Sequence, residues 1–317
     1  MKDMSWRWAG RARRRRAVLD EADLRIRSMS RRSFLWASMA AFATAAGVRW
    51  LETRPPDGGM PWPFRRVFEF NEEVAMDLYS PSRLAPTFPL DRATEPYLNG
   101  QIGMDDTNAA FDPNTWKLRL QGCDMPGQIG SARGPRGLWP GSPESQDATN
   151  SSDAAPAQGD ERQEQAGILL TMADLRKLPH VEMVTQFKCI EGWSNVVHWG
   201  GVRLSDFMTK YPPITLSGNP ADPQNHPEDL PPYLALETPD GGYYVGLDMQ
   251  SALHPQTLLA YELGGGPLTL QHGAPLRLVT TVKYGIKQLK RIGLIRYTTI
   301  RPRDYWAERG YDWYSGH

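Results

Sequence analysis

Alternating apolar and polar positions predict short strands along much of the chain. In "TWKLRLQG" (residues 115–122), Trp116, Leu118 and Leu120 alternate with polar residues and the run ends at a glycine, which is typical of a strand with one buried face. Further strands are predicted in "VEMVTQFKCI" (181–190), at the start of "YYVGLDMQSALHP" (243–255), and twice in "APLRLVTTVKYGIKQLKRIGLIRYTTI" (274–300), where a basic turn joins them.

Capping residues predict three short helices between these strands. Thr171 is the expected N-cap of the first, with Asp174 as its capping-box partner. Ser205 is expected to cap a helix in "VRLSDFMTKYP" (202–212), and a third helix ends just before Pro255. This mixture indicates an α+β fold that is rich in β structure, and a chain of 317 residues can form it as a single domain.

Two segments lack the apolar content of a core. Residues 127–165 are dominated by Gly, Pro, Ser, Ala, Gln and acids, so they cannot bury enough apolar surface to offset the entropy of ordering. We expect them to be a disordered insertion. Residues 46–66 include a Pro/Gly-rich stretch and are expected to be a linker. The folded domain is therefore predicted over residues 67–317.

The basic residues are concentrated at the N-terminus. Of the 36 Lys/Arg and 36 Asp/Glu, 11 basic and 4 acidic residues lie in residues 1–33, which leaves 25 basic and 32 acidic residues, a net charge of −7, for the rest. The body of the chain therefore lacks the basic excess that indicates nucleic-acid binding.

The first residues are typical of an export signal. Arg31 and Arg32 precede an uncharged, alanine-rich run from Ser33 to Val48, and Ala-Thr-Ala at 43–45 offers a small-residue cleavage site. The pattern resembles a twin-arginine signal peptide over residues 1–45, which exports a folded, cofactor-loaded protein to the periplasm or another extracytoplasmic space. An uncleaved membrane anchor is one alternative. A DNA-binding arm is another, but it would give the apolar run no role.

Only two cysteines are present, Cys123 and Cys189, so a disulfide framework is excluded. Cys189 lies at the end of a predicted core strand, just before a glycine turn, where a thiol is held rigidly and can still face a cavity. Four interpretations stay open. The thiol is a metal ligand, an inert buried group, or one half of a Cys123–Cys189 disulfide, or it belongs to a zinc site with Glu191 and His198.

Four segments resemble, in the same order, the molybdopterin-binding domain of the sulfite oxidase family. They are "KCIEGWSNVVHWGGVRL" (188–204), "LALETPDGG" (234–242), "LDMQSALHPQTLLAYELGGGPLTLQHGAPLRLV" (247–279) and "KYGIKQLKRIGLIRYT" (283–298). The resemblance is greatest to the exported bacterial branch that includes the catalytic subunit of the periplasmic methionine sulfoxide reductase. It implies a β-rich fold of the sulfite oxidase type and one molybdenum-molybdopterin per chain.

The resemblance also implies roles for single residues. Cys189 would be the molybdenum ligand. Glu191 matches a glutamate near the metal in the sulfoxide-reducing branch and would relay a proton, or it would instead brace the following turn. The other expected cofactor contacts, each of which could be an ordinary solvated residue, are Asn99, Thr238, His272, Arg277, Lys287, Gln288, Leu289 and Lys290. His272 stands where related sequences often have Asn, and Lys290 is the expected phosphate donor.

The chain has no haem motif of the Cys-x-x-Cys-His type, so the resemblance implies electron exchange with a membrane haem protein or a soluble cytochrome. The 19 residues after Thr298 are too few for the immunoglobulin-like dimerisation domain of the sulfite-oxidising branch, which favours a monomer. We therefore expect an exported oxidoreductase that reduces a small S-oxide or N-oxide by oxygen-atom transfer. The alternatives are a sulfite-oxidising dehydrogenase and a non-catalytic molybdopterin-binding electron-transfer protein.

Overall fold

The computed structural model describes residues 33–57, 60–80, 82–98, 100, 102–104, 111–123 and 167–317. The twin arginines, Asn99 and the predicted insertion at 127–165 lie outside the described residues. The chain divides into two compact units, Met1–Arg65 and Arg66–His317. The second unit starts one residue before Val67, where the sequence places the start of the folded domain.

The described part of the first unit holds a helix over Ser33–Glu52, which is exposed along its length and is long and apolar enough to cross a membrane. A short strand pair follows, β1 (Pro56–Asp57) with β2 (Met60–Pro61). Helix α2 (Trp62–Leu78) begins four residues before the second unit. The predicted linker thus contains regular structure, and Pro63 in the first turn of α2 is compatible with a helix because the amide it lacks has no partner there.

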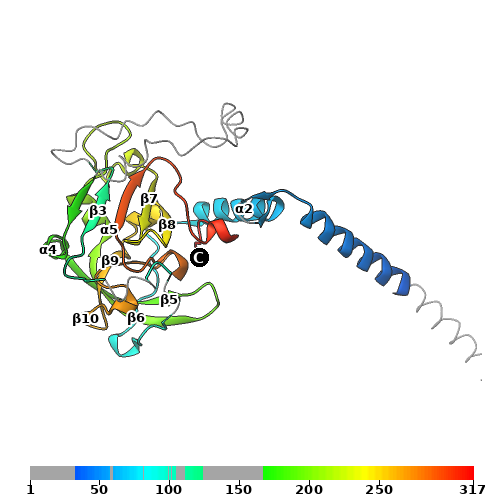
Figure 1. The fold of residues 1–317 in the computed structure, drawn as a ribbon, viewed down its shortest axis with the longest axis horizontal. Helices are drawn as coiled ribbons and strands as arrows, with labels where there is room; N and C mark the ends of the chain where they lie inside the picture. The colour runs from blue at the N-terminus through cyan, green and yellow to red at the C-terminus, as the bar shows by residue number, and fades with distance from the viewer. Residues whose placement is uncertain are drawn as a thin grey trace, which may run out of the picture. The chain divides into compact units, whose positions relative to one another are not determined.

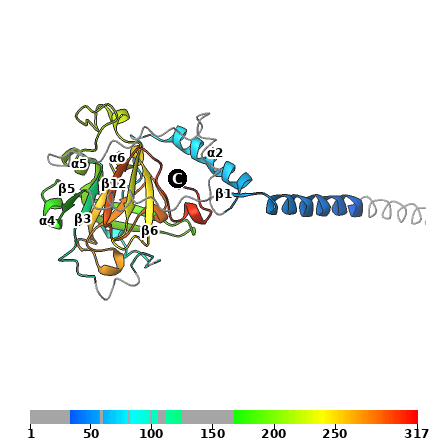
Figure 2. The same ribbon diagram turned by 45° about the horizontal axis from the view of Figure 1, so that its top comes forward.

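Two five-stranded sheets form the second unit (Figures 1 and 2). The first has the order β10-β9-β6-β5, with β11 also paired to β9: β5 (His180–Lys188), β6 (Ser194–Arg203), β9 (Thr257–Leu263), β10 (Gly266–Pro267) and β11 (Arg277–Thr280). The second has the order β4-β3-β12-β7-β8: β3 (Leu118–Gln121), β4 (Ile168–Leu170), β7 (Tyr233–Glu237), β8 (Tyr244–Asp248) and β12 (Leu294–Thr298).

Three short helices connect these strands, α4 (Met172–Leu175), α5 (Leu204–Lys210) and α6 (Met249–Leu253). The predicted capping box of Thr171 and Asp174 is present at α4. The predicted cap at Ser205 is wrong, because β6 runs to Arg203 and α5 starts at the next residue, so Ser205 lies inside the helix. Leu204, the first residue of α5, is fully buried in the core.

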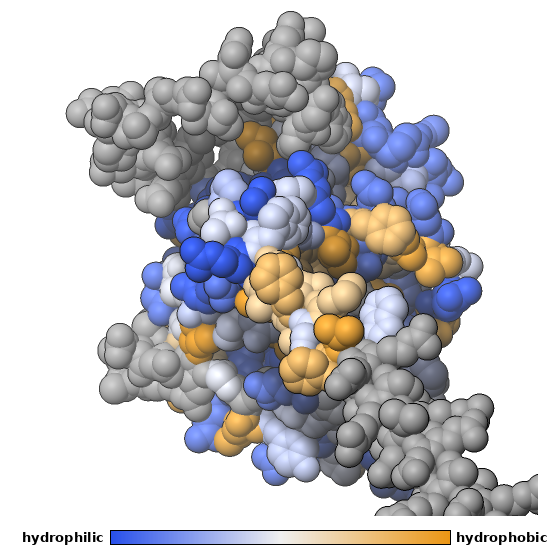
Figure 3. Space-filling view, turned by 90° about the vertical axis from the view of Figure 1, so that its right-hand side faces the viewer, coloured by the Kyte–Doolittle hydropathy of each residue, from blue (hydrophilic) through white to orange (hydrophobic). Residues whose placement is uncertain are grey.

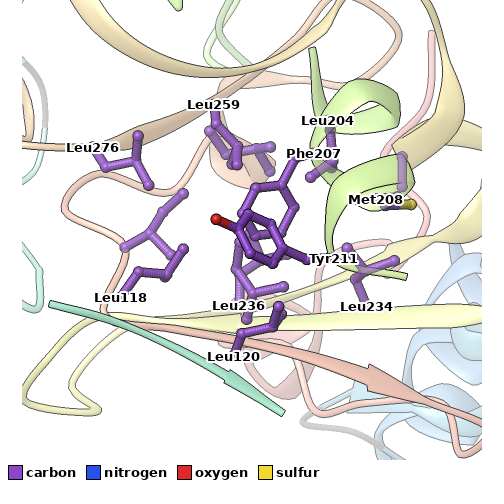
Figure 4. Close-up of a cluster of buried hydrophobic side chains, with 14 of the residues drawn as sticks. Leu118, Leu120, Leu204, Phe207, Met208, Tyr211, Leu234, Leu236, Leu259 and Leu276 are labelled. Carbon is purple, nitrogen blue, oxygen red and sulfur yellow. The ribbon is translucent and has the colours of Figure 1, made fainter. Parts of the chain in front are cut away.

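The larger core cluster draws side chains from both sheets and from α5 (Figure 4). Leu118 and Leu236 come from the second sheet, Leu259 from the first, and Phe207 from α5, and all four are fully buried. A smaller cluster on the first sheet contains Cys189.

Polar side chains cover much of the face in Figure 3, with apolar side chains gathered near its centre. The predicted mixed, β-rich α+β fold is confirmed.

Candidate functional site

Cys189 directly follows β5 and opens the turn that leads into β6. Its backbone is fixed on both sides, since its N–H donates to the Trp193 carbonyl at 2.9 Å and its carbonyl accepts from Gly192 N–H at 3.1 Å. Gly192 has φ 91°, a conformation that favours glycine and lets the chain turn back at once. The strand and the turn together hold the thiol in one place.

The Cys189 thiol is buried, with 6% of the residue exposed. Burial raises its pKa above the ordinary value, and the charge of the nearby Glu191 carboxylate adds to the rise. A thiol in this setting is neutral until a metal or another cation stabilises its charged form. Neither cysteine forms a disulfide in the structure, so the predicted alternative of a Cys123–Cys189 bridge is excluded.

Glu191 lies beside this thiol. Its Oε2 is 3.8 Å from Cys189 Sγ and accepts a hydrogen bond from Trp193 Nε1 at 3.0 Å. The Trp193 ring in turn stacks on Phe187 at a centroid distance of 5.7 Å and meets Tyr97 edge-on at 5.3 Å. One carboxylate oxygen therefore both braces the turn and faces the sulfur, and an aromatic wall fixes its position.

Arg277 on β11 is a buried cation with 3% of its surface exposed. Its guanidinium donates to the carbonyls of His272 at 3.1 Å and Gln288 at 3.4 Å and lies 4.7 Å from the Trp199 ring centroid. Its Nε has no hydrogen-bond partner, and within the described residues no carboxylate forms an ion pair with it. Burial lowers the pKa of Arg277 to about 10, because the charged form is poorly solvated.

His272 and Lys290 add positive charge around Arg277. His272 is 2% exposed, and burial followed by the charges of Arg277 and Lys290 lowers its pKa. Lys290 Nζ donates to the Gly100 carbonyl at 3.3 Å, and burial together with Arg277 lowers its pKa to about 8. Glu95 Oε1 lies 3.9 Å from His272 Nε2, and the Glu95 side chain is 86% exposed. A bound anion would offset this mutual repulsion.

The turn at 287–290 divides its side chains between different environments. Lys287 Nζ donates to Asp304 Oδ2 at 2.6 Å and to the Gly246 carbonyl at 2.9 Å, so its ammonium is directed into the core. Gln288 Nε2 bonds the Thr280 carbonyl at 2.9 Å. Leu289 is fully buried in the larger core cluster. Of the four residues, Lys290 is the one whose charge reaches Arg277 and His272.

Thr238 is buried at the end of β7, and its hydroxyl already has partners. It donates to Asp240 Oδ1 at 2.6 Å and accepts from Tyr243 N–H at 3.0 Å. A contact with a cofactor would therefore require this hydroxyl to exchange one of these bonds. The sequence-based prediction for Asn99 lies outside the described residues.

One buried cation in this region, Arg291, is not among the site residues predicted from the sequence. Arg291 is fully buried, lies 4.2 Å from the Phe111 ring centroid and donates to the Leu270 carbonyl at 3.2 Å. It follows Lys290 in a basic run, and such runs are usually solvated. Its position between the core residues Leu289 and Ile292 was the signal that could have identified it.

Residues 160–306 match the protein family described as "Oxidoreductase molybdopterin binding domain". This match covers just under half of the chain. The matched region includes every predicted site residue except Asn99, and it covers both strands that flank the Cys189 turn.

Several named relatives share the sequence of this chain to different extents. The putative protein-methionine-sulfoxide reductase subunit YedZ1 of Azospira oryzae is 28% identical over 78% of this chain and 73% of its own length. The protein-methionine-sulfoxide reductase catalytic subunit MsrP of Xanthomonas axonopodis is 37% identical over 42% of each chain, and that of Ralstonia nicotianae is 26% identical over 88% of this chain and 69% of its own. The match thus spans less than half of the Xanthomonas relative.

The region that matches this family has donors that fit molybdopterin. Molybdopterin ends in a phosphate, and the buried Arg277, with an unsatisfied Nε and no paired carboxylate among the described residues, is a donor suited to an anion. The Cys189 side chain supplies sulfur, a soft donor that suits a metal already bound by other sulfur ligands. The residues present are therefore compatible with the group that the family binds.

Proposed function

We propose that the protein is an exported molybdenum-dependent oxidoreductase that reduces S-oxides of the methionine sulfoxide type, or related N-oxides, by oxygen-atom transfer. The observation that carries this proposal is the pairing of Cys189 Sγ and Glu191 Oε2, 3.8 Å apart, within the region that matches the molybdopterin-binding family. Reductive removal of oxygen needs a metal and a proton source, and these two side chains offer a ligand and an acid. The names of the relatives support the substrate class.

Each residue has one task in this proposal. Cys189 Sγ holds the molybdenum, while Arg277, His272 and Lys290 hold the anionic end of the pterin. The bound cofactor supplies two-electron oxygen-atom transfer. Glu191 delivers a proton from its carboxyl group toward the oxygen that leaves the substrate, and Trp193 Nε1 keeps that carboxyl oriented.

The remaining cofactor contacts are secondary in the proposal. Thr238 would meet the pterin through its hydroxyl, and Asn99 would lie near the metal. Gln288 and Leu289 would act through the backbone of their turn. Lys287 would do the same, because its side chain is bonded to Asp304.

We also place the protein outside the cytoplasm as a monomer with one molybdenum per chain. The apolar helix over Ser33–Glu52 is compatible with either a signal peptide or an anchor. Electrons would come from a membrane haem protein or a soluble cytochrome, since the sequence has no haem attachment motif of its own.

The test is a substrate panel on the molybdenum-loaded protein. Methionine sulfoxide, dimethyl sulfoxide and trimethylamine N-oxide are assayed with a reduced dye, and sulfite with an oxidising one. We expect turnover of a sulfoxide and none of sulfite, because Glu191 beside the thiol offers the acid that reductive removal of oxygen needs. Sulfite oxidation without sulfoxide reduction would instead establish the dehydrogenase. Bound molybdenum without any turnover would establish a non-catalytic protein.

A further inference from the structure

A second cluster of potential metal ligands lies on the same sheet as the Cys189 turn. His180 and Glu182 come from β5, His198 from β6 and Glu262 from β9. His180 and Cys189 are nine positions apart on an extended strand, which corresponds to about 30 Å. The cluster is therefore separate from the proposed cofactor site.

A β-bulge brings Glu262 onto the same face as the other three side chains. Glu182 pairs with Gly200 and Gly200 with Glu262, so the two glutamates flank one glycine in a single row. The next residue of β6 pairs with Ala260, which leaves Tyr261 as the extra residue. Without this bulge, strand alternation would turn Glu262 to the Ala260 side, into the smaller apolar cluster.

Gly200 provides the space in which these side chains meet. A Cβ at this position would lie 2.5 Å from Glu262 Oε2 and 3.2 Å from His180 Nε2. The absence of a side chain on the central strand therefore lets groups from β5 and β9 approach each other across β6. A larger residue would separate them.

The four side chains form two close His–Glu pairs. His180 Nε2 lies 2.9 Å from Glu262 Oε2, and His198 Nε2 lies 2.9 Å from Glu182 Oε2. One ligand atom from each of His180, Glu182 and Glu262 can be chosen so that all lie within 4.8 Å of one another. Two ligands of a tetrahedral zinc ion, each about 2.1 Å from it, are about 3.4 Å apart, so small side-chain rotations would suffice.

The structure assigns to this cluster a divalent transition-metal site, with Zn²⁺ as the ion and His180, Glu182 and Glu262 as its three protein ligands. Imidazole nitrogen and carboxylate oxygen are both zinc ligands, and three of them leave a position for water. His198 is buried and positions Glu182 through the existing hydrogen bond, as residues next to metal ligands commonly do. The ion joins β5 to β9 across β6.

The experiment is calorimetric titration of ZnCl₂ into the untagged, molybdenum-loaded protein. We expect one zinc per chain, and an increase in Tm of roughly 5–10 °C when free zinc exceeds Kd about 100-fold. His180→Gln and Glu262→Gln should each weaken zinc binding at least about 10-fold, because each removes one of three ligands. Sulfoxide turnover and molybdenum content should not change, which separates this test from that of the proposed function.

His226→Gln is the matched control. His226 Nδ1 lies 3.1 Å from Glu228 Oε1, so this is a second His–Glu pair, on an exposed loop and with no third ligand among the described residues. Its loss should leave zinc binding unchanged. Equal zinc affinity in His180→Gln and the unaltered protein, or loss of binding in His226→Gln, would overturn the assignment, as would the absence of binding in the unaltered protein.

Discussion

At Glu191, the proposed acid role and the bracing role predict different results for one substitution. Glu191→Gln keeps an oxygen that can accept from Trp193 Nε1, but it has no proton to transfer. Sulfoxide turnover per molybdenum should fall roughly 10²-fold, within the usual range for a general acid, while molybdenum content stays normal. Steady-state kinetics on metal-quantified protein measure this change. Full turnover in the Gln variant would eliminate the acid role.

Trp193→Phe tests the bracing role, because it removes the Nε1–H that donates to Glu191 and leaves the Glu191 carboxyl group in place. The loss of one hydrogen bond should cost about 1 kcal/mol of unfolding free energy. A Phe variant that is less stable but keeps its turnover, together with a slow Gln variant, would separate the two roles of Glu191.

Lys290 predicts a pH dependence with a definite sign. Its folded-state pKa is about 8 against an ordinary 10.5, so folding disfavours the charged form. Without the cofactor, the buried charge of Lys290 therefore lowers the unfolding free energy below pH 8. This loss of stability disappears as the pH rises to about 10.5. Lys290→Met should raise the unfolding free energy of cofactor-free protein by roughly 1–3 kcal/mol at pH 7 and by little near pH 10.5.

The same substitution should have the opposite effect on the loaded protein. If Lys290 holds the phosphate end of the cofactor, its loss should lower cofactor retention at pH 7. Urea unfolding at both pH values and molybdenum analysis measure the two effects. A Met variant that retains the cofactor normally would contradict the contact.

At the scale of elements, the sequence predicts what depends on local pattern. The strand into Cys189, the capping box at Thr171 and the helix before Pro255 are all present, because alternation and capping are decided within a few residues. The two strands of 274–300 are also present, but they enter different sheets: β11 pairs with β9 and β12 with β3 and β7. Local alternation of apolar and polar residues does not predict which distant strand each one pairs with.

Other parts of the site depended on tertiary contacts. The sequence around Lys287 predicts a solvated residue in a basic turn. In the structure its ammonium is buried and donates a hydrogen bond to Asp304, 17 positions later. The bulge opposite Gly200 is likewise set by the pairing of β6 with β9. Helix α2 was missed because its apolar residues follow a Pro/Gly-rich stretch and none of them is buried.

The Lys287–Asp304 pair predicts a stability effect that is independent of catalysis. Both side chains are at most 2% exposed, so Asp304→Asn leaves a buried ammonium without its carboxylate and should cost about 3–5 kcal/mol. Glu308→Gln, which breaks the exposed pair with Arg303, should cost less than about 1 kcal/mol. Denaturant unfolding measures both. Equal costs would show that the buried pair is not a structural anchor.

At the scale of the whole molecule, export is the prediction that the sequence makes alone. Arg31 and Arg32 directly precede the uncharged run that starts at Ser33. Replacing both with Lys keeps the charge but removes the arginine pair that the export machinery recognises. A folded, molybdenum-loaded precursor should therefore accumulate in the cytoplasm. Cell fractionation measures its distribution. Unimpaired export of the Lys-Lys variant would contradict the twin-arginine route.

The central claim is that a single thiolate, Cys189, binds molybdenum, and the chain has its own control in Cys123. Both cysteines are buried and neither forms a disulfide, but Cys123 packs in the larger core cluster and Cys189 lies in the turn beside Glu191. The most direct measurement is molybdenum content with the Mo(V) paramagnetic resonance signal of Cys189→Ala and Cys123→Ala. The account predicts loss or gross alteration of molybdenum in the first variant and a normal signal in the second, because Cys189 is the proposed thiolate ligand. An unchanged Mo(V) signal in Cys189→Ala would contradict it.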